Sequence, residues 1–222
     1  SASPVGEYDK RVVILTRELG KITAFARGAR RMKSPLMAVS NPFVFGEFQV
    51  YEGRDSYTLS GANIKEYFLD LAQMQPGVYY GFYFLELAEY FGQEGNDETQ
   101  MLNLLYVTMN AIRRGKQDLR LVRCIFELRT ITISGEAPQM FSCMECSTKE
   151  NLTVFSLRDS AIYCPNCGKT IRDPWPLQPG TVLACRYIIA APLEKLYGFT
   201  VNEEILDELE RLLRAYLHRY VE

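Results

Sequence analysis

Histidine is almost absent from this sequence, and that scarcity excludes much of enzyme chemistry. The only histidine is His218, which lies close to the C-terminal end between Arg214 and Arg219. A catalytic triad, a proton shuttle or a histidine-rich metal site would need imidazoles elsewhere in the chain. We expect His218 to be a surface residue at a helix end, where its partial charge complements the helix dipole.

Nucleotide-binding motifs and long apolar runs are also missing. The chain contains no Gly-x-x-x-x-Gly-Lys-Ser/Thr and no Gly-x-Gly-x-x-Gly, so nothing favours nucleotide hydrolysis or a dinucleotide cofactor. The longest aromatic-rich run, 78–91, is interrupted by Glu86 and Glu89 and is too short to span a bilayer. We therefore expect a soluble, cytoplasmic protein that is not an enzyme and does not contact a membrane.

The most specific motif that is present consists of two Cys-x-x-Cys pairs. Seventeen residues separate the first pair from the second, and the four cysteines are Cys143, Cys146, Cys164 and Cys167. Two such pairs brought together form a tetrahedron of sulfur, the geometry that Zn²⁺ prefers. Four thiolates leave no open position for a substrate, so we expect one structural Zn²⁺. The competing interpretations are two disulfides or a redox pair of the thioredoxin type.

Residues around the cysteines predict a small β-ribbon. Short apolar runs at 152–155 and 161–163 favour two strands. We expect Pro165 to set the turn of the second pair and Gly168 to adopt a positive φ after it. The two remaining cysteines, Cys124 and Cys185, stand in apolar periodic stretches and are expected to be buried.

Positive charge is concentrated at the start of the chain. Residues 1–33 contain eight basic and three acidic residues, a net charge of +5, whereas the whole chain carries −2. A locally basic surface can neutralise phosphates on an acidic protein, so this segment predicts a nucleic-acid interface. An ordinary solvated face is the alternative. The predicted contacts are Arg11, Lys21, Arg27, Arg30, Arg31 and Lys33.

Periodicity divides the chain into a β-rich and a helical part. A hairpin turning at Gly20, a flexible basic loop at 27–33, a strand from Pro42 with a bulge at Gly46, and a strand at 57–64 suit a small curled barrel. Ser1–Ser3 are either an appended remnant or the tail of a strand. Aromatic side chains here either fill the barrel or stack on bases, and these are Phe25, Phe43, Phe45 and Phe48.

Helical periodicity begins after Ile64. Helices are predicted at 76–92, from a capping box at Asp97 and Gln100 to Gly115, around 121–128, from an N-cap at Thr181 to Ala190, and from Asn202 onward. We expect residues 1–63 to form the barrel, 64–142 and 168–222 to form one helical domain, and 143–167 to be the metal-binding insertion.

Several strings in this chain resemble the bacterial RecO family of recombination mediators. They are Gly6-Glu-Tyr-Asp-Lys10, Leu15-Thr-Arg-Glu-Leu-Gly-Lys21, Ala26-Arg-Gly-Ala-Arg-Arg31, Leu177-Gln-Pro-Gly-Thr181 and Pro192-Leu-Glu-Lys-Leu196. The resemblance implies an α+β protein with an N-terminal OB-type barrel, a helical domain and a four-cysteine zinc module. Members usually have a strand before the segment matching Gly6, and only five residues precede Gly6 here.

The resemblance also implies an activity and a set of partners. Family members bind single- and double-stranded DNA, anneal complementary strands and act with RecR to help RecA displace the single-stranded-DNA-binding protein. We expect the same of this chain, in association with the bacterial nucleoid. The alternatives are a zinc-stabilised protein scaffold without DNA affinity and a thiol oxidoreductase, which would need an accessible thiol of low pKa.

Overall fold

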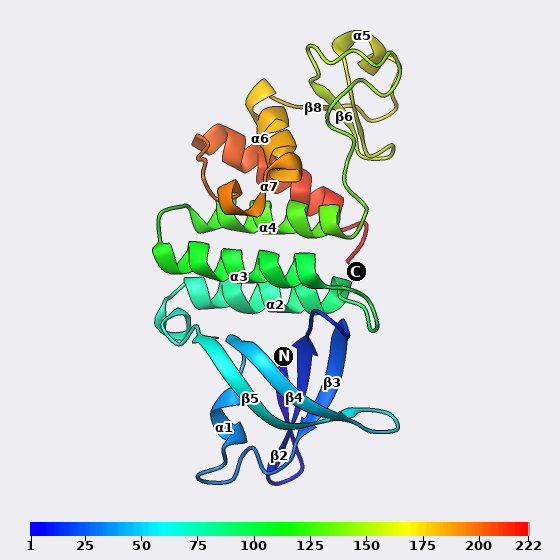
Figure 1. The fold of residues 1–222 in the computed structure, drawn as a ribbon. Coiled ribbons are helices and arrows are strands. Elements are labelled where there is room, and N and C mark those ends of the chain that lie inside the picture. The colour runs from blue at the N-terminus through cyan, green and yellow to red at the C-terminus, as the bar shows by residue number, and fades with distance from the viewer. Residues whose placement is uncertain (222) are drawn as a thin grey trace. The chain divides into compact units, whose positions relative to one another are not determined.

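The chain folds into two compact units, Ser1–Arg113 and Arg114–Glu222. The structure is a computed structural model that describes residues 1–221 (Figure 1). A sheet occupies the start of the first unit and helices follow, so the α+β class is confirmed. No helix among residues 1–221 combines the length and the apolar composition that crossing a membrane requires.

The sheet of the first unit has the connectivity of an OB-type barrel. Its five strands run in the order β1-β2-β3-β5-β4, and all neighbours are antiparallel except β3 and β5. This partly open Greek-key arrangement is the one expected. The strands are β1 (Ala2–Val5), β2 (Asp9–Leu15), β3 (Lys21–Ala26), β4 (Val44–Glu52) and β5 (Tyr57–Tyr67). Of the first three residues, Ala2 and Ser3 belong to β1.

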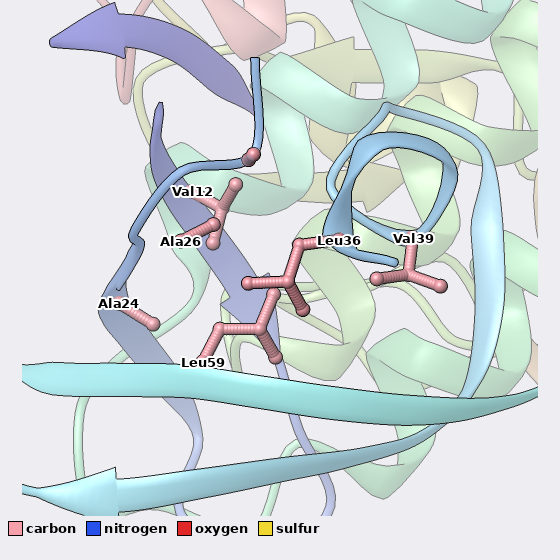
Figure 2. Close-up of a cluster of buried hydrophobic side chains, with 7 residues drawn as sticks. Val12, Ala24, Ala26, Leu36, Val39 and Leu59 are labelled. Carbon is pink, nitrogen blue, oxygen red and sulfur yellow. The ribbon is translucent and has the colours of Figure 1, made fainter. Parts of the chain in front are cut away.

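Alternating residues of these strands form the barrel core. Val12, Ala24, Ala26 and Leu59 point inward and are fully or almost fully buried (Figure 2). A one-turn helix that the sequence analysis missed, α1 (Leu36–Val39), adds Leu36 and Val39 to the same cluster. Burial of each large aliphatic side chain contributes roughly 1.5–3 kcal/mol. The core therefore fixes which face of each strand points to solvent.

The predicted bulge in β4 is confirmed, but the start of that strand was wrong. The register against β5 shifts between Phe45 and Gly46. Phe43 precedes the strand with φ of +64°, and its ring packs against Phe82 with centroids 4.7 Å apart. Phe45 packs against Tyr106, and Phe48 packs on the barrel core. These three phenylalanines are packing residues, whereas Phe25 lies on the other face of the sheet.

Three helical segments complete the first unit, namely η1 (Leu71–Gln73), α2 (Gly77–Phe91) and α3 (Thr99–Arg114). The predicted aromatic helix is α2, which buries Phe84 and Leu87 but leaves Tyr79 and Tyr90 exposed. Asp97 caps α3 by accepting the Thr99 N–H at 2.8 Å. The neighbouring Glu98 carboxylate accepts the Gln93 N–H at 3.0 Å, a contact outside the predicted capping box.

The second unit is a helical bundle with a small module inserted in it. The helices are α4 (Leu119–Ile133), α6 (Pro179–Ala190), η2 (Leu193–Lys195) and α7 (Glu203–Leu217). The last helix begins next to Asn202 as predicted, the Asn202 side chain caps it, and the exposed His218 follows its last residue. Thr181 is not an N-cap, because α6 begins at Pro179 and the buried Thr181 hydroxyl donates to Glu208 instead.

The inserted module contains β6 (Val154–Ser156), β7 (Ala161–Tyr163), α5 (Pro165–Gly168) and β8 (Trp175–Pro176). The first two strands form the predicted β-ribbon, with β6 displaced slightly from the predicted range. β8 pairs with the free side of β6 and was not predicted. The module therefore has a three-stranded sheet that supports the cysteine segments.

Candidate nucleic-acid interface and candidate metal centre

The basic loop, defined here as residues 27–33, is held against the turn between β1 and β2. The Gly28 N–H donates to Asp9 Oδ1 at 2.7 Å, and the Arg30 N–H donates to the Tyr8 carbonyl at 2.8 Å. A guanidinium nitrogen of Arg30 also donates to the Gly6 carbonyl at 3.3 Å. Ala29, within the loop, is completely buried and belongs to the barrel core. The loop thus has a defined conformation that directs its cations outward.

The cations of this loop are exposed and are not neutralised within the protein. Arg27, Arg30, Arg31 and Lys33 are all exposed. Among residues 1–221, no ion pair joins any of them to a carboxylate. The Arg31 guanidinium lies over the Tyr8 ring, 4.9 Å from its centroid, which orients the arginine without cancelling its charge. The loop therefore keeps its full positive charge for a ligand.

Lys10 adds a further cation that the sequence analysis did not select. Its ammonium donates to Asn41 Oδ1 at 2.7 Å. Burial, and secondly the positive charge of Arg30, lower the pKa of Lys10. The second cause places Lys10 within the field of the loop. The sequence alone does not show that Lys10 pairs with Ala26 at the end of β3, beside the basic loop.

Arg11 and Lys21 occupy different positions relative to the loop. Arg11 is exposed on β2 and pairs with Phe25 of β3. Lys21 begins β3, so about 20 Å of extended strand separates it from Arg27. The Lys21 ammonium instead donates to the Glu89 carbonyl at 2.7 Å, near the C-terminal end of α2. The structure therefore brings Arg11 near the loop but leaves Lys21 at the far end of the strand.

The four predicted thiols converge on one point in the second unit. The sulfur atoms of Cys143, Cys146, Cys164 and Cys167 all lie within 4.8 Å of one another. The Cys146 and Cys164 sulfurs are 3.8 Å apart. Metal–sulfur bonds of about 2.3 Å in a tetrahedron would give sulfur–sulfur separations of about 3.8 Å. The cluster therefore fits a tetrahedral thiolate-bound metal ion.

Backbone N–H groups favour the thiolate form at this cluster. Burial alone would raise the pKa of Cys143, but N–H groups of Cys146, Cys164 and Glu145 outweigh it and lower that pKa to about 6. The pKa of Cys164 is also lowered, first by the Cys167 N–H, whereas a hydrogen bond with the Cys164 thiol raises the pKa of Cys167 to about 12. A metal ligand must be a thiolate. The peptide groups of the two turns therefore favour thiolates at Cys143 and Cys164, the form that a metal ion binds.

The predicted positive φ of Gly168 was wrong. Gly168 is not among the residues with positive φ, whereas Ser147, after the first pair, has φ of +60°. A Cβ on Gly168 would lie 2.8 Å from a methyl carbon of Val154. Glycine is needed here because the turn packs closely against β6, and only the three-dimensional structure reveals that contact.

All six cysteines are free thiols, so neither predicted pair forms a disulfide in this structure. The second pair lies between β7 and the single helical turn α5. The four-sulfur convergence still favours a metal over redox chemistry. Cys124 and Cys185 are buried as predicted, and burial raises the pKa of Cys185 to about 12.

Comparisons with known proteins find matches to both parts of the chain. The model described as "Recombination protein O N terminal" matches residues 1–68, and "Recombination protein O C terminal" matches residues 77–222. "DNA repair protein RecO" of Alkaliphilus metalliredigens (strain QYMF) is 32% identical over 96% of this chain and 87% of its own length.

Two further relatives carry the same name and support the same assignment. The protein from Caldicellulosiruptor saccharolyticus is 30% identical over 95% of this chain and 86% of its own length. The protein from Dehalococcoides mccartyi (strain CBDB1) is 30% identical over 98% of this chain and 86% of its own length. Both family models, and similarity over at least 95% of this chain, therefore show that it belongs to the RecO family of DNA repair proteins.

Proposed function

We propose that this protein is a DNA repair and recombination mediator that binds single- and double-stranded DNA without sequence preference and anneals complementary strands. The observation that carries the proposal is the basic loop, whose four exposed cations have no carboxylate partner among residues 1–221. Unneutralised cations held in fixed positions attract phosphates of any sequence. A mediator that acts on any damaged strand needs binding that does not depend on the DNA sequence.

The loop geometry supports phosphate contacts by Arg27, Arg30, Arg31 and Lys33, with Arg11 and Lys10 beside them. Lys21 has a weaker case, because its ammonium is already bonded to Glu89. Holding two strands by their phosphates screens their mutual repulsion and leaves their bases free to pair. Annealing by this route requires no covalent step and no nucleotide.

The metal completes the proposal as a structural element. Cys143, Cys146, Cys164 and Cys167 would hold one Zn²⁺, because four sulfurs in a tetrahedron suit that ion best. The ion would supply binding energy for folding and no reactive position, since all four sites are taken by protein sulfur. Its apparent contribution is on the order of 10 kcal/mol.

The proposed partners follow from membership of the RecO family. The protein would act with RecR and help RecA to load onto single strands covered by the single-stranded-DNA-binding protein, in the cytoplasm at the bacterial nucleoid. Contacts with the RecA filament would be indirect. The relatives' shared name, DNA repair protein RecO, supports the repair role.

A strand-annealing assay without nucleotide tests this function. We expect the protein to accelerate annealing of complementary oligonucleotides, and the variant with Arg27, Arg30 and Arg31 changed to glutamate to lose the acceleration. A control variant should change the same charge elsewhere, for which the exposed Arg114, Lys149 and Arg172 are suitable. Absence of both DNA affinity and annealing in the unaltered protein would favour the zinc-stabilised protein scaffold.

A further inference from the structure

One row of side chains crosses the outer face of the barrel sheet. The strand register pairs Arg11 with Phe25, Phe25 with Thr58, and Thr58 with Tyr51. Directly paired residues of neighbouring strands point to the same face of a sheet. The outer row, defined as Arg11, Phe25, Thr58 and Tyr51, therefore runs across β2, β3, β5 and β4.

The barrel core shows independently that this row faces outward. Val12, Ala24 and Leu59 are in the core cluster, and each is the immediate neighbour of a member of the row (Figure 2). Val50, which precedes Tyr51, also packs against that cluster. Since successive residues of a strand alternate between faces, the row lies on the side away from the core.

Aromatic surface and positive charge occur together on this face. Tyr51 is 70% exposed, an unusual exposure for a large aromatic side chain in a sheet. Arg11 is exposed beside Phe25, and Arg27 follows Phe25 by two positions, which continues the face into the basic loop. Asp9 also faces this side, but its carboxylate accepts the Gly28 N–H at 2.7 Å. The Asp9 acceptor is therefore engaged within the loop.

We propose that the outer row is a base-stacking platform for single-stranded DNA, with bases on Tyr51 and Phe25 and phosphates on Arg11 and Arg27. This inference rests on the proposed function and adds to it a contact that only unpaired bases can make. Aromatic rings stack on any base, so the platform keeps the binding independent of sequence. Bases inside a duplex are already stacked and cannot reach it.

The platform is compatible with annealing because it is small. Tyr51 and Phe25 lie two strands apart, roughly 10 Å at the usual spacing between neighbouring strands. Each ring can therefore stack on a different base of one strand. The remaining bases stay free to pair with a complementary strand.

The test compares three probes of equal length: a thymidine oligonucleotide, the same backbone made entirely of abasic sites, and a duplex. Replacing Tyr51 with leucine removes the ring and keeps an apolar side chain. We expect Tyr51→Leu to weaken binding of the thymidine probe roughly 5- to 150-fold, the equivalent of one stacked base. Binding of the abasic and duplex probes should stay within about twofold of the unaltered protein.

Two variants sharpen the test and one acts as a control. Tyr51→Phe keeps the ring and should retain binding of the thymidine probe, while Phe25→Leu should weaken it as Tyr51→Leu does. Tyr79→Leu changes a 63% exposed tyrosine on α2 and should alter none of the three affinities. A urea unfolding curve for each variant checks that the fold is retained.

The outcomes separate the platform from the proposed function. If Tyr51→Leu and Phe25→Leu bind the thymidine probe as the unaltered protein does, the platform is wrong, and reversal of the loop arginines still decides whether the loop binds DNA. If the unaltered protein binds none of the three probes, the proposed function itself fails. Equal weakening of thymidine and abasic binding would also overturn stacking.

Discussion

The basic loop and the cysteine cluster each gather several functional groups, but the groups of the cluster face one another and those of the loop face solvent. The four sulfurs converge within 4.8 Å, and backbone N–H groups favour the thiolate state of Cys143 and Cys164. The loop cations point outward and have no carboxylate partner among residues 1–221. A bound ion would close the first set, whereas the second set needs a ligand from outside.

The difference shows how structural and binding groups can be distinguished. Groups that serve stability satisfy one another, as Arg120 does with Glu203, Asp207 and Glu210 between α4 and α7. Groups that serve binding are held by backbone contacts that leave their charge available, as Arg30 is held by Gly6 and Tyr8. Changes in the cysteine cluster should therefore alter metal content and folding, and changes in the loop should alter DNA affinity.

The largest expected effect is the loss of the proposed zinc ion in Cys164→Ser. Removing one of four thiolates should reduce bound zinc from one per chain to nearly none, at a cost on the order of 10 kcal/mol of apparent binding energy. Residues 139–176 should then lose protection in hydrogen exchange, while affinity for single-stranded DNA stays within about threefold. Zinc retained at one per chain, or a large loss of DNA affinity, would contradict the assignment of a structural role to the cluster and a DNA-binding role to the loop.

A smaller effect is expected for Gly168→Ala, which tests the close packing of the second cysteine turn. The new Cβ would lie 2.8 Å from a Val154 methyl carbon, so we expect a destabilisation of about 1–3 kcal/mol, measured by chemical unfolding. Gly61→Ala is the control in the barrel, since its Cβ would meet only the end of the Gln49 side chain. Equal losses in the two variants would show that Gly168 has no special packing role.

The second unit should also lose stability at alkaline pH because of the buried Cys185 thiol. Burial raises the pKa of Cys185 to about 12, so its thiol stays neutral in the folded state. In the unfolded chain the Cys185 thiol ionises above about pH 8.5, which favours the unfolded state. The free energy of unfolding therefore falls as the pH rises from that value towards the folded pKa, and the loss is about 2 kcal/mol at pH 10. Cys185→Ala should unfold with a shallower dependence on pH between 8 and 10. An unchanged dependence would contradict this assignment.

The smallest expected effect is that of replacing Asp9. Its negative charge weakens DNA binding, whereas its hydrogen bond supports the loop that binds DNA. Removing an anion near the cations should by itself strengthen DNA binding, but Asp9→Ala also removes the acceptor of the Gly28 N–H. Loss of that bond, worth about 1 kcal/mol, should weaken DNA binding roughly fivefold. Asp9→Asn keeps an oxygen acceptor and should bind at least as tightly as the unaltered protein. Tighter binding by Asp9→Ala would show that the loop needs no support.

Sequence patterns predicted the features that depend on residues close together in the chain. The cysteine spacing identified all four convergent thiols, and the Gly20 turn and Gly46 bulge followed from alternation within neighbouring strands. The elements that were missed depend on distant partners. β8 exists because Trp175 and Pro176 pair with β6, and α1 exists because Leu36 and Val39 fill the barrel core.

The same limit applies to the candidate interface. Charge composition located the basic segment, but only the strand register shows that Lys21 lies at the far end of β3 and that Arg11 shares a face with Tyr51. Tyr51 gave no sequence signal of its own, because an aromatic residue in a strand is normally read as core. Its exposure depends on which face of the barrel the core occupies.

The most direct test of the central claim is a salt titration of affinity for single-stranded DNA. We compare the unaltered protein, the variant with Arg27, Arg30 and Arg31 changed to glutamate, and the control with Arg114, Lys149 and Arg172 changed to glutamate. Losing three phosphate contacts should reduce the slope of log affinity against log salt by about 2, with affinity falling roughly a hundredfold. The control should keep both values. Equal changes in the two variants, or none in the loop variant, would contradict the claim that the loop binds DNA.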